Sequence, residues 1–265
     1  DNVLAVRVNS RENLNIPPFG YAIDYMTFGG MYREVYVQVR NKTHLADVFV
    51  KPQIHPLQVT TEITVQNISD GITLQQEIRK KGEGAYSPLG QKPVKQTNVQ
   101  TVFPVQEICL WEPENPHLYE IRTSLWKNGE MIDARVDITG FREAGFRKDG
   151  FYLNGKKLRL RGLNRHQSYP YVGYAAPASM QIFDADILKK ELGVNAVRTS
   201  HYPQSQDFIR RCDEIGLLVF TEFPGWQHIG DEEWKRQAVQ NLKEMIVQYR
   251  NHPSIILWGV RINES

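Results

Sequence analysis

Short stretches in which apolar and polar residues alternate dominate the first half of the chain. The alternation predicts strands at 3–8, at 32–39 and then at short spacing between about 46 and 141. Gly and Pro residues separate these strands, and Asn128-Gly129 between two apolar pairs is a hairpin signal. Many short strands with few helical periods predict an immunoglobulin-like β-sandwich over 42–142.

The pattern changes after about residue 150, where short apolar strands alternate with amphipathic helices. The strand-like segments are 158–163, 194–197, 217–220 and 255–258. The segments with helical spacing are 180–192, 208–215 and 231–250, and Gly216 is the expected C-cap of the second helix. Strands without alternation are buried on both faces. The order therefore predicts a parallel sheet, either doubly wound or half of a (β/α)8 barrel.

Composition excludes several classes of protein. The 265 residues include 32 Lys+Arg and 30 Asp+Glu, a formal net charge of +2, so no strong field favours nucleic acid or an anionic membrane. No apolar run approaches the roughly 18 residues of a membrane span. Cys109 and Cys212 lie far apart, which argues against a disulfide scaffold or zinc knuckle and leaves the compartment open. Neither a Gly-rich phosphate loop nor a GxSxG elbow occurs.

Polar residues follow each predicted strand of the second half. In parallel α/β sheets, sites gather at the carboxyl ends of the strands, so these side chains are expected at one rim. They are Asn164, Arg165 and His166, then Arg198 and His201, then Glu222, Trp226 and His228, and finally Arg261, Asn263 and Glu264.

Two carboxyl groups at such a rim favour acid/base chemistry. Different surroundings give two carboxyls different pKa values, so that one acts as acid and the other as base or nucleophile, as glycoside cleavage requires. The residues alone pair Glu222 with Glu264. Trp226 offers a stacking surface for a sugar ring.

Two long motifs carry a resemblance to a known family. Residues 195–203, Asn-Ala-Val-Arg-Thr-Ser-His-Tyr-Pro, with the segment that follows to Phe220, resemble the first signature of glycoside hydrolase family 2. Residues 251–264, from Asn-His-Pro-Ser to Asn-Glu, resemble its acid/base signature. Residues 30–36 are similar to the end of the family's sugar-binding domain, and residues 162–166 to the start of its barrel. The Asn-Arg-His motif and the Pro-Gly-Trp loop at 224–226 are most similar to the β-galactosidase branch.

The resemblance implies a fold in three parts. Residues 1–41 would be the C-terminal strands of a jelly-roll sugar-binding sandwich, 42–142 the immunoglobulin-like sandwich, and 143–265 the first four strands of a TIM (β/α)8 barrel. We therefore expect a chain truncated at both ends. On this interpretation it is inactive alone and self-associates through the open edges of its half-barrel.

The resemblance also implies an activity, cleavage of terminal β-galactosides by a retaining exo-glycosidase with two carboxylates. Glu264 maps to the acid/base, and the nucleophile is expected beyond residue 265. The expected substrate-binding residues are Asn263 at the sugar 2-hydroxyl, His201, His166, Asn164, Trp226, and Asp24 from the sandwich side. Arg198, Glu222 and Arg261 are expected to line the site and hold neighbouring groups.

A cofactor is not expected. Family members that use magnesium carry Glu-x-His after the third strand, and the corresponding residues here are Trp226, Gln227 and His228. A hard cation prefers oxygen ligands, and the carboxylate is replaced by Trp226. We therefore predict no magnesium site.

Other interpretations of the function stay open. The sequence does not separate a galactoside from a glucuronide or mannoside substrate within the same family. A non-catalytic carbohydrate-binding fragment would share the folds, although the Asn263-Glu264 pair argues against it. A Schiff-base aldolase on a barrel is disfavoured because no lysine ends a predicted strand.

Overall fold

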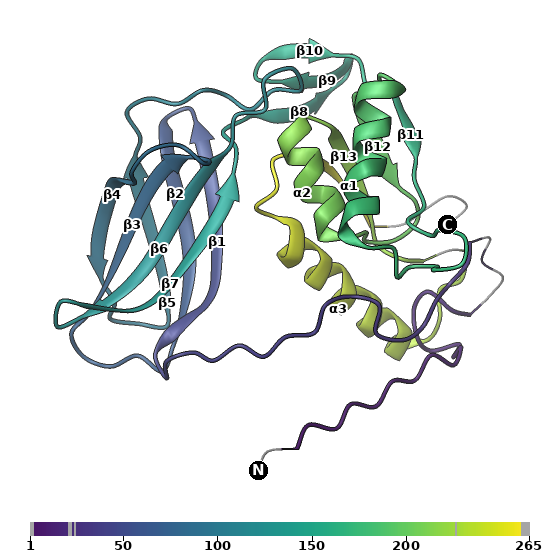
Figure 1. Ribbon diagram of the computed structural model, residues 1–265, viewed down its shortest axis with the longest axis horizontal. Coiled ribbons are helices and arrows are strands. Elements are labelled where there is room, and N and C mark those ends of the chain that lie inside the picture. The colour runs from purple at the N-terminus through teal and green to yellow at the C-terminus, as the bar shows by residue number, and fades with distance from the viewer. Residues whose placement is uncertain (1–2, 21–22, 24, 226, 261–265) are drawn as a thin grey trace.

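A β-sandwich and a helix-covered parallel sheet form most of the structure, a computed structural model that describes residues 3–20, 23, 25–225 and 227–260 (Figure 1). The sandwich has one sheet in the order β1-β2-β5 and a second in the order β4-β3-β6-β7. Its strands are β1 (His44–Ile54), β2 (Leu57–Gln66), β3 (Ile72–Lys80), β4 (Ser87–Pro93), β5 (Asn98–Pro104), β6 (Tyr119–Lys127) and β7 (Glu130–Thr139). Two antiparallel sheets of three and four strands have the immunoglobulin-like form expected for this part of the chain.

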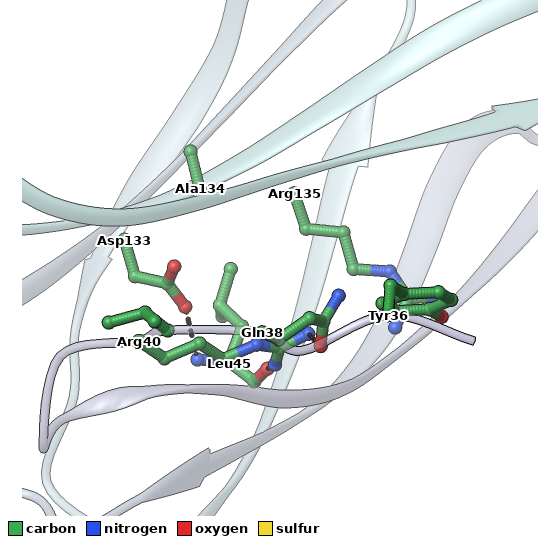
Figure 2. A pocket seen from close by; sticks show the side chains of 8 residues that line it. Tyr36, Gln38, Arg40, Leu45, Asp133, Ala134 and Arg135 are labelled. Carbon is green, nitrogen blue, oxygen red and sulfur yellow. Dashed lines mark hydrogen bonds between the residues drawn. The ribbon is translucent and has the colours of Figure 1, made fainter. Parts of the chain in front are cut away.

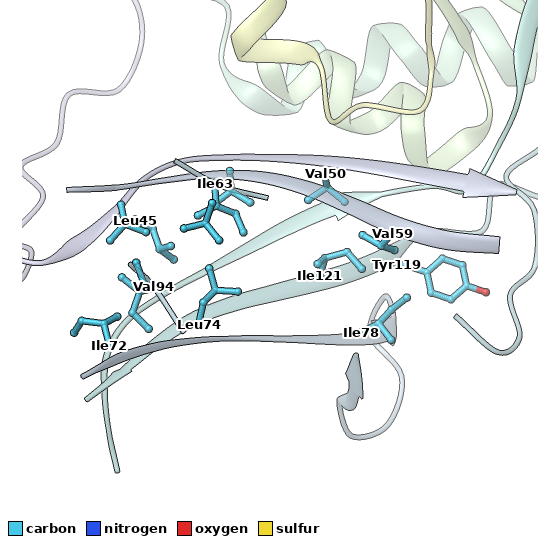
Figure 3. Close-up of a cluster of buried hydrophobic side chains, with 14 of the residues drawn as sticks. Leu45, Val50, Val59, Ile63, Ile72, Leu74, Ile78, Val94, Tyr119 and Ile121 are labelled. Atoms are coloured by element: carbon cyan, nitrogen blue, oxygen red, sulfur yellow. The ribbon is translucent and has the colours of Figure 1, made fainter. Parts of the chain in front are cut away.

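The sandwich core comes from the inward-facing residues of both sheets. Alternate residues of β3 are buried, and Leu74 packs with Leu45 and Ile121 in one apolar cluster (Figure 3). Gln76 also points inward, where its amide nitrogen donates to Thr61 and Thr123 at 3.1 and 3.0 Å. Because its polar atoms are bonded within the core, this buried glutamine is tolerated.

The second half contains a parallel sheet whose strands follow sequence order. It consists of β11 (Gly162–Asn164), β12 (Ala196–Thr199), β13 (Leu218–Glu222) and β14 (Ile255–Gly259), each paired in parallel with the next. The helices are α1 (Ala178–Asp186), the π-helical turn η1 (Ile187–Glu191), α2 (Gln206–Ile215) and α3 (Glu232–Tyr249). Strand order without reversal distinguishes the start of a (β/α)8 barrel from a doubly wound sheet. None of the helices in the described ranges is long and apolar enough to cross a bilayer.

The helices cover one face of this sheet, and a small antiparallel sheet covers part of the other. Phe208 and Ile209 of α2 and Met245 of α3 pack against Val197 and Val219. Leu218 faces the opposite way, against a cluster that includes Trp111 and Phe151. The small sheet is β8 (Ala144–Arg147), β9 (Gly150–Leu153) and β10 (Lys156–Leu158). The single strand predicted at 158–163 is divided between β10 and β11.

The N-terminal segment differs from its sequence-based prediction. No strand or helix occurs among the described residues up to 41, although alternation predicted strands at 3–8 and 32–39. A strand needs a neighbour for its backbone hydrogen bonds, and alternation alone does not supply one. A groove of about 540 Å³, lined by Tyr36, Gln38 and Arg40 on one side and Asp133 and Arg135 on the other, lies between this segment and β7 (Figure 2). The assignment of 1–41 to a sugar-binding sandwich stays a prediction.

Partly buried polar contacts join the sandwich to the parallel sheet. The Arg142 guanidinium donates to the carbonyl oxygens of Pro253, at 2.6 Å, and of Ile255. Burial lowers the pKa of Arg142 to about 10. Asn251 accepts a hydrogen bond from the backbone of Val50 at 3.1 Å. The sandwich therefore fixes the start of β14.

Gly216 offers a test of how tightly the end of α2 packs against the sandwich half of the chain. It ends α2 with φ 70°, and a Cβ there would lie 2.2 Å from the Pro113 carbonyl oxygen. We expect Gly216→Ala to lower the free energy of unfolding by about 2–4 kcal/mol, which adds about 1 for the left-handed backbone to about 1–3 for overpacking. Gly193→Ala is the matched control, because Gly193 has φ 65° with no atom within 4 Å of such a Cβ. Urea unfolding measures both, and equal losses would show that the Pro113 contact costs nothing.

Candidate functional site

The carboxyl ends of β12 and β13 bring three of the predicted site residues together. Glu222, the last residue of β13, is fully buried. Its Oε1 accepts a hydrogen bond from Arg198 Nε, and its Oε2 lies 3.0 Å from His201 Nδ1. The parallel pairing of Arg198 with Phe220 sets β12 and β13 in this register. Glu222, which was expected to hold neighbouring groups, thus contacts both Arg198 and His201.

Aromatic rings surround His201. The Tyr25 and His166 ring centroids lie 5.9 and 5.6 Å from that of His201, and Tyr25 is 5.3 Å from Tyr202. His166 Nδ1 and the Tyr202 hydroxyl are 3.3 Å apart. Burial raises the pKa of the Tyr202 hydroxyl, so it stays protonated at neutral pH. His166 and His201 therefore share one partly aromatic wall, and their role in binding sugar hydroxyls stays a prediction.

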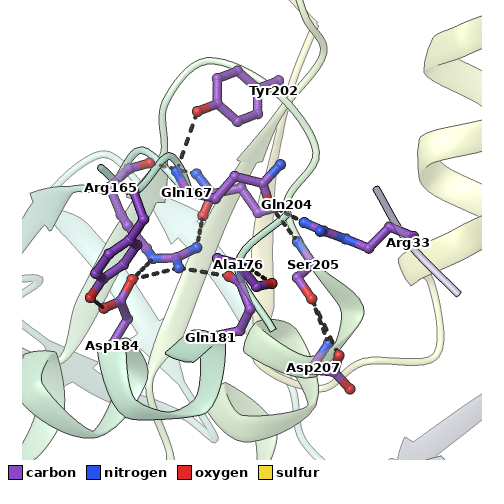
Figure 4. A network of polar contacts seen from close by, with 11 residues as sticks. Arg33, Arg165, Gln167, Ala176, Gln181, Asp184, Tyr202, Gln204, Ser205 and Asp207 are labelled. Atoms are coloured by element: carbon purple, nitrogen blue, oxygen red, sulfur yellow. Dashed lines mark hydrogen bonds and ion pairs between the residues drawn. The ribbon is translucent and has the colours of Figure 1, made fainter. Parts of the chain in front are cut away.

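Arg165 differs from the rim position that its place after β11 suggested. Its side chain is only 6% exposed and lies in a polar network under the strand ends (Figure 4). The guanidinium donates to Asp184 at 2.6 Å, to Gln181 at 2.7 Å and to Gln204 at 2.5 Å. Gln204 in turn donates its amide to the Arg165 carbonyl oxygen. Arg165 therefore ties the loop after β11 to α1 and to the loop after β12.

Burial affects the electrostatics of this network. Desolvation lowers the pKa of Arg165, and the charge of Asp184 acts in the opposite direction. The guanidinium also lies 4.1 Å over the Phe208 ring, which adds a cation–π contact. Asn164 and His166 on either side of Arg165 are exposed. The Asn-Arg-His motif thus supplies two exposed candidates for substrate contact and one buried support.

The N-terminal segment crosses the loops that carry the site. Arg33 donates to the Gln167 side chain at 2.9 Å and to the Tyr174 carbonyl oxygen at 2.5 Å. The Tyr174 hydroxyl donates to the Met26 carbonyl oxygen at 2.7 Å. The sequence offered no signal for these contacts beyond the motif at 30–36, because the partners are separated by more than 130 residues.

Five predicted site residues belong to the parts of the chain that the structure does not describe. Asp24, Trp226, Arg261, Asn263 and Glu264 lie outside the described residues, so their roles stay predictions.

Within the described ranges, no group of three or more His, Cys, Asp or Glu side chains could hold a metal ion. His228 packs edge-on against Trp234, with ring centroids 6.0 Å apart. The absence of a magnesium site also stays a prediction.

Two family models match successive parts of the chain. "Glycosyl hydrolases family 2" matches residues 43–142, and "Glycosyl hydrolases family 2, TIM barrel domain" matches residues 145–265. Together these ranges cover the sandwich, the small sheet and the parallel sheet.

Similar proteins include glycosidases much longer than this chain. A β-galactosidase of Thermoanaerobacter pseudethanolicus is 49% identical over all of this chain, which spans 36% of that protein. A β-galactosidase of Thermoanaerobacterium thermosulfurigenes is 48% identical, again over the whole chain and 38% of its own length. The solved structure of Bacteroides uniformis β-glucuronidase 2, covalently bound to cyclophellitol-6-carboxylate aziridine, matches with a TM-score of 0.84 at 29% identity. That match covers 95% of this chain and 32% of the other.

Because the Arg165 network is buried, we expect its disruption to destabilise the fold more than the disruption of an exposed ion pair of the same length. Arg165→Met leaves Asp184 without its cation, and we expect the free energy of unfolding to fall by about 3–5 kcal/mol. Arg236→Met is the matched control, since the Arg236–Glu233 pair has the same 2.6 Å separation as the Arg165–Asp184 pair but an arginine that is 66% exposed. We expect a small fraction of the loss there. Urea denaturation measures both variants, and similar losses would contradict the role assigned to Arg165.

Proposed function

The chain belongs to glycoside hydrolase family 2, and we propose that it is part of an enzyme that hydrolyses terminal β-galactosides with retention of configuration. The observation that carries this proposal is the similarity to β-galactosidases over the entire chain. The contact of Glu222 with Arg198 and His201 at the strand ends supports it, because it builds a polar site at the edge where barrel enzymes act.

We assign the acid/base role to Glu264, which follows the fourth parallel strand. Gly259, five residues before Glu264, lies opposite Glu222 in the parallel register. An acid at this edge protonates the leaving oxygen in the first step and activates water in the second. Asn263 binds the sugar 2-hydroxyl, a contact that strengthens as the oxocarbenium-like transition state forms.

Glu222 is a poor candidate for the nucleophile. It is fully buried, and both carboxylate oxygens are engaged, one by Arg198 and the other by His201. A nucleophile in retaining glycosidases needs an oxygen that can reach the anomeric carbon. We therefore propose that a carboxylate other than Glu222 attacks the sugar, and that Glu222 supports the residues that bind it.

Sugar hydroxyls would be bound by side chains from both halves of the chain. His166, His201 and Asn164 come from the parallel-sheet side, and Asp24 comes from the N-terminal segment. The ring of Tyr25, next to Asp24 in sequence, packs against both histidines. This packing brings the N-terminal segment to the site and favours a joint sugar-binding surface.

Glu264→Gln tests the acid/base assignment in the full-length protein. We expect kcat/KM for an alkyl β-galactoside to fall by about 10²–10⁴, since proton donation to a poor leaving group is lost. An aryl galactoside with an acidic phenol needs little protonation and should lose far less. Glu232→Gln, at an exposed glutamate in the first turn of α3, is the control and should change neither rate. Equal losses on both substrates would contradict the assignment.

Substrate identity can be tested with the same protein. Hydrolysis of an aryl β-glucuronide or β-mannoside in place of the galactoside would favour another specificity within the family. Galactose or glucuronate binding by calorimetry without any hydrolysis would favour a carbohydrate-binding role.

We also propose that the 265-residue chain self-associates and shows no turnover by itself. Within the described part of the chain, β11 and β14 are the edges of the parallel sheet, and Leu163 and Leu257 on them are partly exposed. Open edges with apolar side chains pair with other chains. Light scattering should therefore report dimers or larger species, and Leu163→Lys should reduce them. Val102→Lys, on the sandwich edge strand β5, is the control, and a monomer at all concentrations would overturn the proposal.

A further inference from the structure

Glu222 holds a histidine and an arginine with one buried carboxylate. Arg198 can only donate, so the contact at Oε1 is an N–H···O bond. Oε2 lies 3.0 Å from His201 Nδ1. Since a carboxylate oxygen accepts, the donor in this second contact is Nδ1–H.

The sheet holds this carboxylate in place from both sides. On β14, a Cβ at Gly259 would lie 2.8 Å from Glu222 Cγ and 2.8 Å from the Phe220 ring. The Phe223 backbone nitrogen donates to the Gly259 carbonyl oxygen at 2.9 Å, which fixes the chain directly after Glu222. On β12, Arg198 is paired with Phe220. Glu222 therefore has little freedom to turn away from its two partners.

The His201 ring has equally little freedom. It is buried, and the Tyr25 and His166 rings pack beside it. In an imidazole, Nε2 lies at the edge of the ring away from Nδ1, so the contact with Glu222 directs Nε2 away from the carboxylate. A neutral ring carries its proton on one nitrogen only, and the other nitrogen is then an acceptor.

We propose that Glu222 is a positioning residue that keeps the His201 proton on Nδ1 and presents Nε2 as a hydrogen-bond acceptor for a sugar hydroxyl. This inference rests on the proposed function for its ligand, whereas the tautomer follows from the contact of Nδ1 with a carboxylate oxygen, which accepts. Arg198 completes the arrangement because it occupies the other oxygen and keeps the carboxylate from rotating.

Glu222→Gln should reverse the tautomer. Arg198 requires an acceptor, so the amide oxygen of the glutamine faces Arg198 and the amide nitrogen faces His201. An NH₂ group cannot accept from Nδ1–H, and the ring proton moves to Nε2. The hydroxyl acceptor is lost without a change in side-chain size. By comparison with residues that orient metal-bound histidines, we expect kcat/KM in the full-length protein to fall roughly 10- to 100-fold.

Nitrogen NMR of selectively ¹⁵N-histidine-labelled intact protein reads the tautomer without any need for activity. The His201 signals are identified by their loss in His201→Ala, and Nδ1 and Nε2 are told apart by their couplings to the ring carbon-bound protons. We expect a protonated Nδ1 and an unprotonated Nε2 at neutral pH in the unchanged protein, and the reverse in Glu222→Gln. Glu214→Gln, at a carboxylate paired with Lys81 and Arg211, is the control and should leave the signals unchanged.

A double-mutant cycle separates positioning from a purely structural role. If Glu222 acts through His201, Glu222→Gln should cost less than about threefold in kcat/KM once His201→Ala is present, because coupled sites are not additive. An undiminished cost in that background, or a protonated Nε2 in the unchanged protein, would overturn the proposal. Even if Glu222→Gln does not fold, the tautomer of His201 in the unchanged protein still tests the proposal. Absence of glycosidase activity with the expected tautomers would instead refute the proposed function and the sugar ligand.

Discussion

Asp213, near the end of α2, is the buried polar group on which the helix, the fourth parallel strand and the sandwich meet. Its carboxylate accepts a hydrogen bond from the Ser254 backbone at 3.0 Å and contacts His252 Nδ1. Its carbonyl oxygen accepts from the Trp111 indole at 2.9 Å. A buried carboxylate is tolerated only where hydrogen bonds replace the lost water. The requirement to satisfy the Asp213 carboxylate therefore sets where β14 begins relative to α2. The bond from Trp111 to the Asp213 backbone carbonyl attaches the sandwich half of the chain to the same helix.

The position of β14 then determines the geometry of the site. Arg142 from the sandwich holds two carbonyl oxygens at the start of this strand, and pairing with β13 brings Gly259 opposite Glu222. The glycine leaves room for a carboxylate that would collide with any larger residue. A few polar contacts thus link the packing of the two halves of the chain to the strand register and to the orientation of Glu222. The fixed carboxylate in turn orients Arg198 and His201.

The elements nearest the site were largely predictable because their burial repeats along the chain. The helix expected at 231–250 is α3, and Gly216 caps α2 in the left-handed conformation as anticipated. Glu222 and His201 were expected at neighbouring strand ends, where they meet. The turn of Arg165 into the interior was not predictable, since its partners lie on α1 and on the loop after β12. Neither were the contacts of Arg33 with the loop after β11.

Beyond residue 41, the sequence by itself determined the kinds of element and the change from sandwich to parallel sheet near residue 150. It also determined the family resemblance that two matching family models support. These features depend on local periodicity and on motifs contiguous in the chain. Only the tertiary structure decided which polar side chains face the site and which support it. It also decided that the alternating residues 32–39 form no strand. Both outcomes depend on partners far away in sequence, because a side chain's environment and a strand's hydrogen bonds exist only once those partners have packed.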